Sequence, residues 1–154
     1  MYKLSIFYKK GVKLYRPTEE EVERRKKEYE KVRLEEIAEK ILKIPHKKRA
    51  DGKYDVYGDI NLYGMRLNSL LDIPIRFGKV YGSFSCSYNQ LRDLKGAPEY
   101  VGKDFFCSYN QLVNLEGAPK YVGRDFFING NLKKFTEEEI RKVVEVKGDV
   151  YVYV

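Results

Sequence analysis

The chain has few of the residues on which metal, disulfide and redox chemistry depend. Its 154 residues include two cysteines, one histidine and no tryptophan. Two cysteines are too few for a disulfide scaffold or a four-ligand zinc site, and one histidine gives little support for a triad or a metalloenzyme. No P-loop, dinucleotide-binding, zinc-protease or serine-hydrolase motif is present. We therefore expect a protein that is not an enzyme and that holds no cofactor and no metal.

Long hydrophobic runs are also missing. No apolar stretch approaches the roughly 18 residues that span a bilayer, and Met1–Lys10 has neither the apolar core nor the cleavage site of a signal peptide. The composition, 43% hydrophobic and 34% charged, is typical of a chain that folds. We expect a cytoplasmic protein with no membrane partner.

The excess of positive charge is confined to the first third of the chain. Residues 1–50 carry 16 Lys and Arg against 9 Asp and Glu, whereas residues 51–154 carry 14 of each kind. Such asymmetry indicates two segments with different tasks. It predicts an N-terminal strand and charged helix over residues 1–50 and a second domain over residues 51–154.

A repeat fills the second domain. Val80–Leu94 reads VYGSFSCSYNQLRDL and Val101–Leu115 reads VGKDFFCSYNQLVNL, at an offset of 21 residues. Weaker copies extend this pattern in both directions. Five repeats therefore begin at Val56, Val80, Val101, Val122 and Val146. Short repeats that stack on their neighbours form a solenoid.

Positions within a repeat are counted from its opening valine, and positions five and seven are apolar throughout. A spacing of two residues is that of one face of a β-strand, so these side chains should point into the core of one stacked parallel sheet. Position five holds Ile60, Phe84, Phe105, Phe126 and Val150, and position seven holds Leu62, Cys86, Cys107, Ile128 and Val152. At position ten, Asn89, Asn110 and Asn131 should satisfy backbone groups at a turn.

The run F-x-C-S-Y-N-Q-L-x-x-L, followed by G-A-P and V-G-x-D-F, resembles the short leucine-rich repeats of bacterial and bacteriophage proteins. The resemblance covers about residues 56–154. It implies an α/β repeat fold, a leucine-rich-repeat solenoid with a short parallel sheet. It also implies a non-enzymatic recognition protein, commonly encoded by a phage or its bacterial carrier, that binds and modulates a host protein.

A capping box predicts a helix in the N-terminal segment. Thr18 and Glu21 have the spacing of this motif and should begin a helix that runs to about Lys43. Its apolar residues crowd into the second half, so its C-terminal turns should dock while its first turns face solvent. The apolar runs Tyr2–Tyr8 and Val12–Tyr15 predict a hairpin, or a strand followed by a bend.

A second capping box predicts the C-terminal cap. Thr136 and Glu139 should begin a short helix that ends near Val144. A last strand over Asp149–Val154 would follow, and helix and strand together should seal the end of the solenoid.

The outward positions supply the candidate binding residues. If positions five and seven point inward, then positions four, six and eight point away from the sheet. Position four is mostly aspartate, and position six becomes aromatic in the last three repeats. Exposed aromatic clusters often mark binding sites. We expect a protein partner that covers the aromatic stripe and presents a basic patch to the aspartates. The candidate partner-binding residues are Asp104, Phe106, Asp125, Phe127, Tyr151 and Tyr153.

Two alternatives remain open. In one, basic side chains of the N-terminal third neutralise nucleic-acid phosphates; the candidates are Arg24, Lys27, Lys47, Lys48 and Arg49. The same helix carries nine glutamates, however, and mixed charge is typical of an exposed helix. In the other alternative the stripe is covered within the protein itself, by the N-terminal helix or by a second copy in a self-associating structural solenoid.

Three further features have plainer interpretations. The cysteines at position seven should be inert core residues, because a buried thiol behaves as a small hydrophobe. His46 should lie in an exposed loop within a basic run. The aspartate row should pair with nearby cations such as Lys103 and Arg124, or face water, rather than bind a metal.

Overall fold

The computed structural model describes residues 15–153. The predicted N-terminal hairpin falls on residues 1–14 and Tyr15, and so lies almost wholly outside the described residues. By their contacts the described residues form two units, which divide between Val32 and Arg33. The sequence places the division at residue 50. The structure places residues 33–50 with the repeats, because Ile37, Ala38 and Ile41 are buried in the same core.

Helix α1, Glu19–Ile41, begins at the predicted capping box. The Thr18 N–H donates to the Glu21 carboxylate at 2.8 Å, and the Glu21 N–H donates to Thr18 Oγ1 at 3.1 Å. Both backbone donors are thereby satisfied at the start of the helix. Residues 22–32 are all exposed, whereas the buried residues of α1 lie in its last turns. The prediction that the C-terminal turns dock is confirmed.

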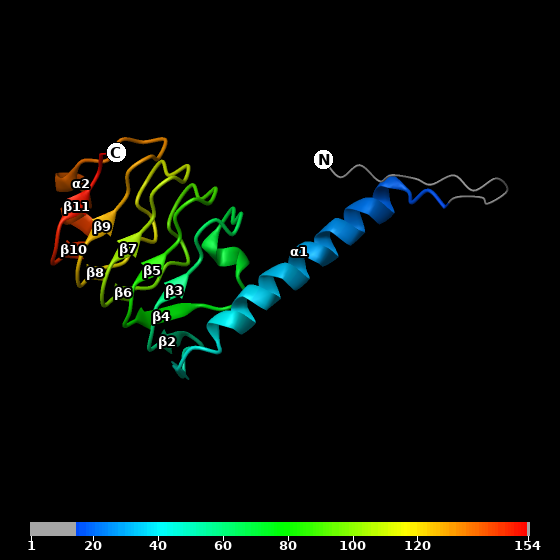
Figure 1. The fold of residues 1–154 in the computed structure, drawn as a ribbon, viewed down its shortest axis with the longest axis horizontal. Coiled ribbons are helices and arrows are strands. Elements are labelled where there is room, and N and C mark those ends of the chain that lie inside the picture. The colour runs from blue at the N-terminus through cyan, green and yellow to red at the C-terminus, as the bar shows by residue number, and fades with distance from the viewer. Residues whose placement is uncertain (1–14, 154) are drawn as a thin grey trace. The chain divides into compact units, whose positions relative to one another are not determined.

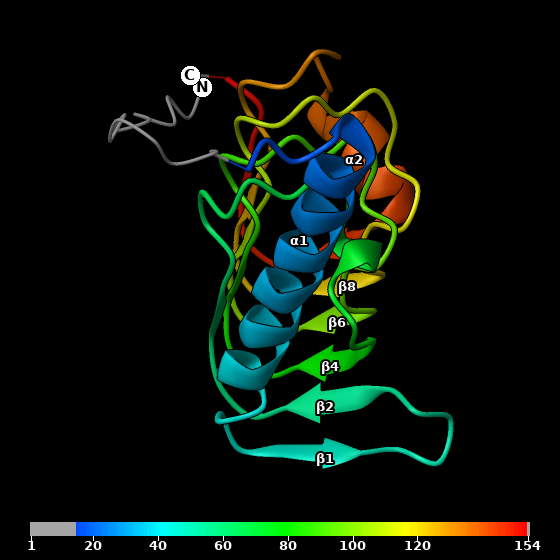
Figure 2. The same cartoon turned by 90° about the vertical axis from the view of Figure 1, so that its right-hand side faces the viewer.

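The repeats form two sheets, where the sequence predicted one. The first sheet contains, side by side, β1 (His46–Lys48), β2 (Tyr54–Val56), β4 (Phe77–Val80), β6 (Tyr100–Val101), β8 (Tyr121–Val122) and β10 (Glu145–Val146). The second contains β3 (Ile60–Asn61), β5 (Phe84–Ser85), β7 (Phe105–Phe106), β9 (Phe126–Phe127) and β11 (Val150–Tyr151). Figure 1 shows the strands of both sheets following one another from repeat to repeat, and Figure 2 shows the order of β1, β2, β4, β6 and β8 in the first sheet. The structure is thus a mixed α/β fold with two sheets, whose strands are parallel except for β1.

A bend of three residues separates the two strands of each repeat and is the reason for the second sheet. Each bend contains a glycine, and from the second repeat onward this glycine packs against the backbone of the preceding bend. A Cβ added to Gly102 would lie 2.9 Å from the carbonyl carbon of Tyr81. Larger residues at this position would therefore push the repeats apart.

The predicted register of the five repeats is confirmed. Each opening valine pairs with the next, from Val56 with Val80 to Val122 with Val146. Position-five residues pair in the same way across the second sheet. Phe105 is fully buried, and its ring stacks between those of Phe84 and Phe126, with centroids 5.9 and 5.1 Å apart. The core thus lies inside the stack of repeats.

The asparagines of position ten join each repeat to the one before. Asn110 Oδ1 accepts the Leu91 N–H at 3.1 Å, and Asn110 Nδ2 donates to the carbonyls of Cys86 and Cys107 at 2.9 and 3.2 Å. Asn89 makes the corresponding bonds one repeat earlier. The predicted role of these amides is confirmed.

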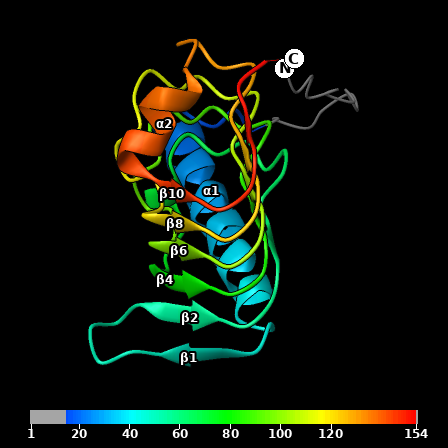
Figure 3. The same ribbon diagram turned by 90° about the vertical axis from the view of Figure 1, so that its left-hand side faces the viewer.

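The two ends of the stack are closed differently. At the first repeat, β1 pairs antiparallel with β2 where the sequence predicted an exposed loop, so His46 is exposed but lies in a strand. At the last repeat, α2 (Glu137–Val143) begins at the predicted capping box and lies at the β10 end of the first sheet (Figure 3). The predicted last strand, Asp149–Val154, is shorter in the structure. It comprises Val150–Tyr151, because its neighbour β9 offers only two residues for pairing. A 3₁₀ helix, Leu70–Asp72, lies between β3 and β4.

Candidate binding surface

The predicted aromatic stripe is present on the outer face of the second sheet. Phe106, Phe127 and Tyr151 lie at equivalent positions of β7, β9 and β11. The rings of Phe106 and Phe127 stack with centroids 4.6 Å apart, and those of Phe127 and Tyr151 with centroids 4.5 Å apart. Both phenylalanines are half-buried and Tyr151 is exposed. We call these three residues the outer aromatic stack.

A groove of about 420 Å³ runs beside this stack on the same face. It lies within the usual volume range of ligand sites. Among the described residues, those that line the groove include no charged side chain. The lining comprises aromatic rings, hydroxyls and amides: Asn61, Tyr63, Ser85, Ser87, Tyr88, Phe106, Ser108, Tyr109, Phe127 and Asn129.

A second set of contacting rings forms part of the groove and was not predicted from the sequence. Tyr63 packs against Tyr88 at a tilted angle with centroids 4.8 Å apart, and Tyr88 stacks with Tyr109 at 4.5 Å. Desolvation and the neighbouring tyrosines raise the pKa of Tyr88. Tyr88 and Tyr109 have left-handed backbone conformations, with φ of 57° and 54°. The glycines at the same position of other repeats, Gly64 and Gly130, were the available signal that this backbone is unusual.

Position eight does not point fully outward, which corrects the predicted alternation. Ser87 and Ser108 are buried, because they lie beyond the ends of β5 and β7 and their hydroxyls form hydrogen bonds between neighbouring repeats. Ser87 Oγ accepts the Ser108 N–H at 3.1 Å, and Ser108 Oγ donates to Asn129 Oδ1 at 2.7 Å. Tyr153, also at position eight, is 84% exposed. It is no part of the outer aromatic stack.

The aspartate row contributes to the backbone structure. Asp104 Oδ1 accepts the Asp125 N–H at 3.1 Å, and Asp125 Oδ1 accepts the Asp149 N–H at 2.9 Å. Arg124 Nε lies 3.7 Å from Asp104 Oδ1, as predicted for a nearby cation. Asp104 and Asp125 are half-buried. These carboxylates therefore hold successive bends together at the border of the candidate surface.

The basic candidates of the N-terminal third occupy different settings. Arg24 and Lys27 are exposed on α1 in the first unit, and Lys47 and Lys48 are exposed on β1 in the second. Arg49 is held within a network of ion pairs.

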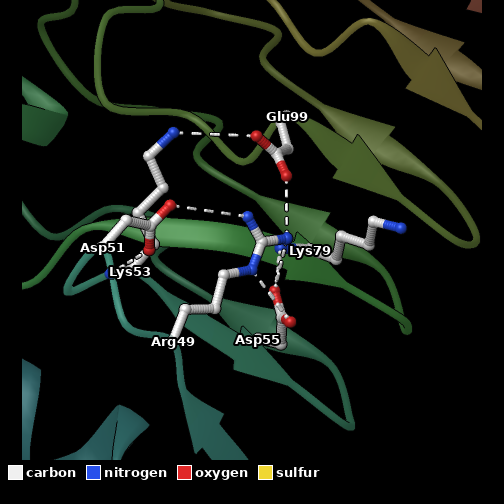
Figure 4. Close-up of polar contacts among 6 residues, drawn as sticks. All are labelled: Arg49, Asp51, Lys53, Asp55, Lys79 and Glu99. Carbon is white, nitrogen blue, oxygen red and sulfur yellow. Dashed lines mark hydrogen bonds and ion pairs between the residues drawn. The ribbon is translucent and has the colours of Figure 1, made fainter.

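Figure 4 shows the Arg49 guanidinium between two carboxylates. Its Nη2 lies 2.8 Å from Asp55 Oδ1 and 2.8 Å from Glu99 Oε1. Both hydrogen bonds raise the pKa of Arg49, and the bond from Arg49 lowers the pKa of Glu99. Burial raises the pKa of Asp55, but the bonds from Arg49 and from the Lys79 N–H outweigh it and leave this pKa below its usual value. Arg49 therefore ties the β1–β2 turn to the loop before β6.

Other chemistry-bearing residues offer no second site. Cys86 and Cys107 are free and buried, and desolvation raises the pKa of both thiols. His46 Nδ1 lies 2.8 Å from the Ile44 carbonyl oxygen. Within residues 15–153, no cluster of three His, Cys, Asp or Glu side chains could hold a metal ion. No helix in the described part of the chain is long and apolar enough to cross a membrane.

No protein-family model matches the chain, and comparisons with curated proteins and with solved structures find no match.

Proposed function

We propose that this chain is a non-enzymatic protein-binding module, a leucine-rich-repeat solenoid that binds a host protein through the outer face of its second sheet. The outer aromatic stack is the observation that carries this proposal. Its three rings lie in register beside an uncharged groove. Protein interfaces concentrate aromatic residues at their centre and leave charge at the rim. Asp104 and Asp125 lie at the border of this surface, in the place of such a charged rim.

The contribution of the stack can be tested with a double substitution, Phe106→Ser with Phe127→Ser. We expect capture of a partner from a bacterial host lysate to weaken by at least about tenfold, because aromatic residues at an interface centre carry much of the binding energy. Tyr57→Ser with Tyr81→Ser is the matched control. These rings also stack, at 5.1 Å, and both are exposed, but they lie in the bends that follow β2 and β4 and do not line the groove. The control variant should capture the partner as well as the wild type does.

Two results would contradict the proposal. If the double variant keeps its partner and capture instead depends on salt and on Lys47 and Lys48, the basic strand β1 is the binding element and nucleic acid becomes the leading candidate. If the wild type is a dimer that the same double variant dissociates, the stack joins two copies of the chain. Thermal unfolding of each variant tests whether the fold is retained.

A further inference from the structure

The outer aromatic stack ends abruptly at the third repeat. Position six holds Phe106, Phe127 and Tyr151 in the last three repeats but Asn61 and Ser85 in the first two. Ser85 pairs in register with Phe106 on the neighbouring strand. One face of the Phe106 ring is covered by Phe127, whereas the side chain on its other side is too small to stack. In the described part of the chain, Phe106 has no other ring contact.

The space above Ser85 belongs to the groove. Ser85 and Phe106 both line it, with Asn61 on the far side and the contacting rings of Tyr63 and Tyr88 in its wall. Asn61 Oδ1 accepts the Tyr63 N–H at 3.0 Å, which fixes the side-chain amide beside this space. The vacant position therefore lies between a phenyl face and a fixed amide.

The lining determines the chemistry of an occupant. It has no charged side chain among the described residues, so a charged group buried here would lack a counter-charge and would lose its hydration. A planar aromatic group would instead gain an offset or parallel contact with Phe106. Its polar edge, if it has one, would meet the Ser85 hydroxyl and the Asn61 amide. An uncharged aromatic ring fits these conditions best.

On the basis of the proposed function, we infer that the protein partner inserts an uncharged aromatic side chain above Ser85, where it stacks on Phe106 as the next ring of the outer aromatic stack. The rest of the partner lies along the groove toward Phe127. Recognition then depends on one inserted ring, and the first two repeats provide specificity through the small residues at position six.

A model ligand tests this inference directly. N-acetyl-L-tryptophanamide is uncharged, and because the chain has no tryptophan, indole emission reports the ligand alone. We expect saturable binding to the full chain, with a shift of the emission to shorter wavelength and shifts of the Ser85 and Phe106 amide resonances. N-acetyl-L-leucinamide, which has no ring, should leave these resonances unchanged.

Ser85→Phe is the decisive variant, because it fills the space with a ring of the protein itself. It should abolish binding of the model ligand without lowering the melting temperature, since the new ring extends the stack. Val113→Phe adds a ring at an exposed position that does not line the groove, and it should bind like the wild type. Equal binding by wild type and Ser85→Phe, or no binding by the wild type, would overturn the inference.

Partner capture separates this inference from the proposed function. If Ser85→Phe still captures the partner while Phe106→Ser with Phe127→Ser does not, the inference of an inserted ring is wrong and the proposed binding face is supported. If neither variant loses the partner, the binding face is wrong as well. A wild-type dimer that Ser85→Phe dissociates would place a ring of a second copy in the space and would also overturn the inference.

Discussion

Phe105→Ala should destabilise the protein by about 3–5 kcal/mol, the usual cost of truncating a buried phenylalanine. Phe105 is fully buried and stacks between two other inward rings. Its removal leaves a cavity that the repeats cannot close without losing their register, because both neighbouring strands are held by parallel pairing. Urea unfolding followed by circular dichroism measures the change.

Phe106→Ala is the matched control, since it removes the same side chain one residue away. Phe106 is half-buried and stacks on one face only, so we expect a loss of about 1 kcal/mol, within the range of a single aromatic pair. A larger loss for Phe106→Ala than for Phe105→Ala would show that the assigned inner and outer faces are exchanged.

Asn110→Ala should cost about 2–4 kcal/mol, because it leaves a buried backbone donor without a partner. The Leu91 N–H would lose the Asn110 Oδ1 acceptor, and the carbonyls of Cys86 and Cys107 would each lose one donor. Those carbonyls keep a second donor, from Asn89 and Asn131 respectively, which limits the effect. Unfolding in urea again provides the measurement.

Asn114→Ala provides the comparison for this substitution. Asn114 is exposed, and its Oδ1 accepts only the nearby Glu116 N–H at 3.0 Å. Water can replace that bond, so we expect a loss of no more than about 1 kcal/mol. Equal losses for the two variants would mean that the asparagines of position ten do not join the repeats as described.

The stacking of the repeats could be predicted from the sequence because the same residue types recur at the same positions. The inward column that includes Phe105 and the amide column that includes Asn110 each required only a count from the opening valine. The second sheet could not be predicted in this way. Strands of two residues are too short to show the alternation by which a strand is usually recognised, and the bend between them is signalled only by a glycine.

The candidate surface was predictable in part for the same reason. Alternation placed Phe106 and Phe127 on the outer face, where the structure has them. It failed at position eight, because Ser87 and Ser108 lie beyond the ends of β5 and β7, where the alternation of a strand no longer applies. Tyr88 and Tyr109 escaped prediction because their left-handed backbone conformations remove them from the strand pattern. Strand β1 was missed because its three polar residues carry no periodic signal.

Thiol labelling tests the inner and outer faces most directly. The only cysteines of the chain, Cys86 and Cys107, lie at inward position seven and are buried. We expect neither to react with an aromatic disulfide reagent in the folded protein and both to react once it is unfolded in urea. Ser85→Cys places a thiol at outward position six, one residue away, and should react in the folded state with one equivalent of reagent. Rapid labelling of Cys86 in the folded wild type, with protection of the thiol in Ser85→Cys, would contradict the assigned faces and the binding surface built on them.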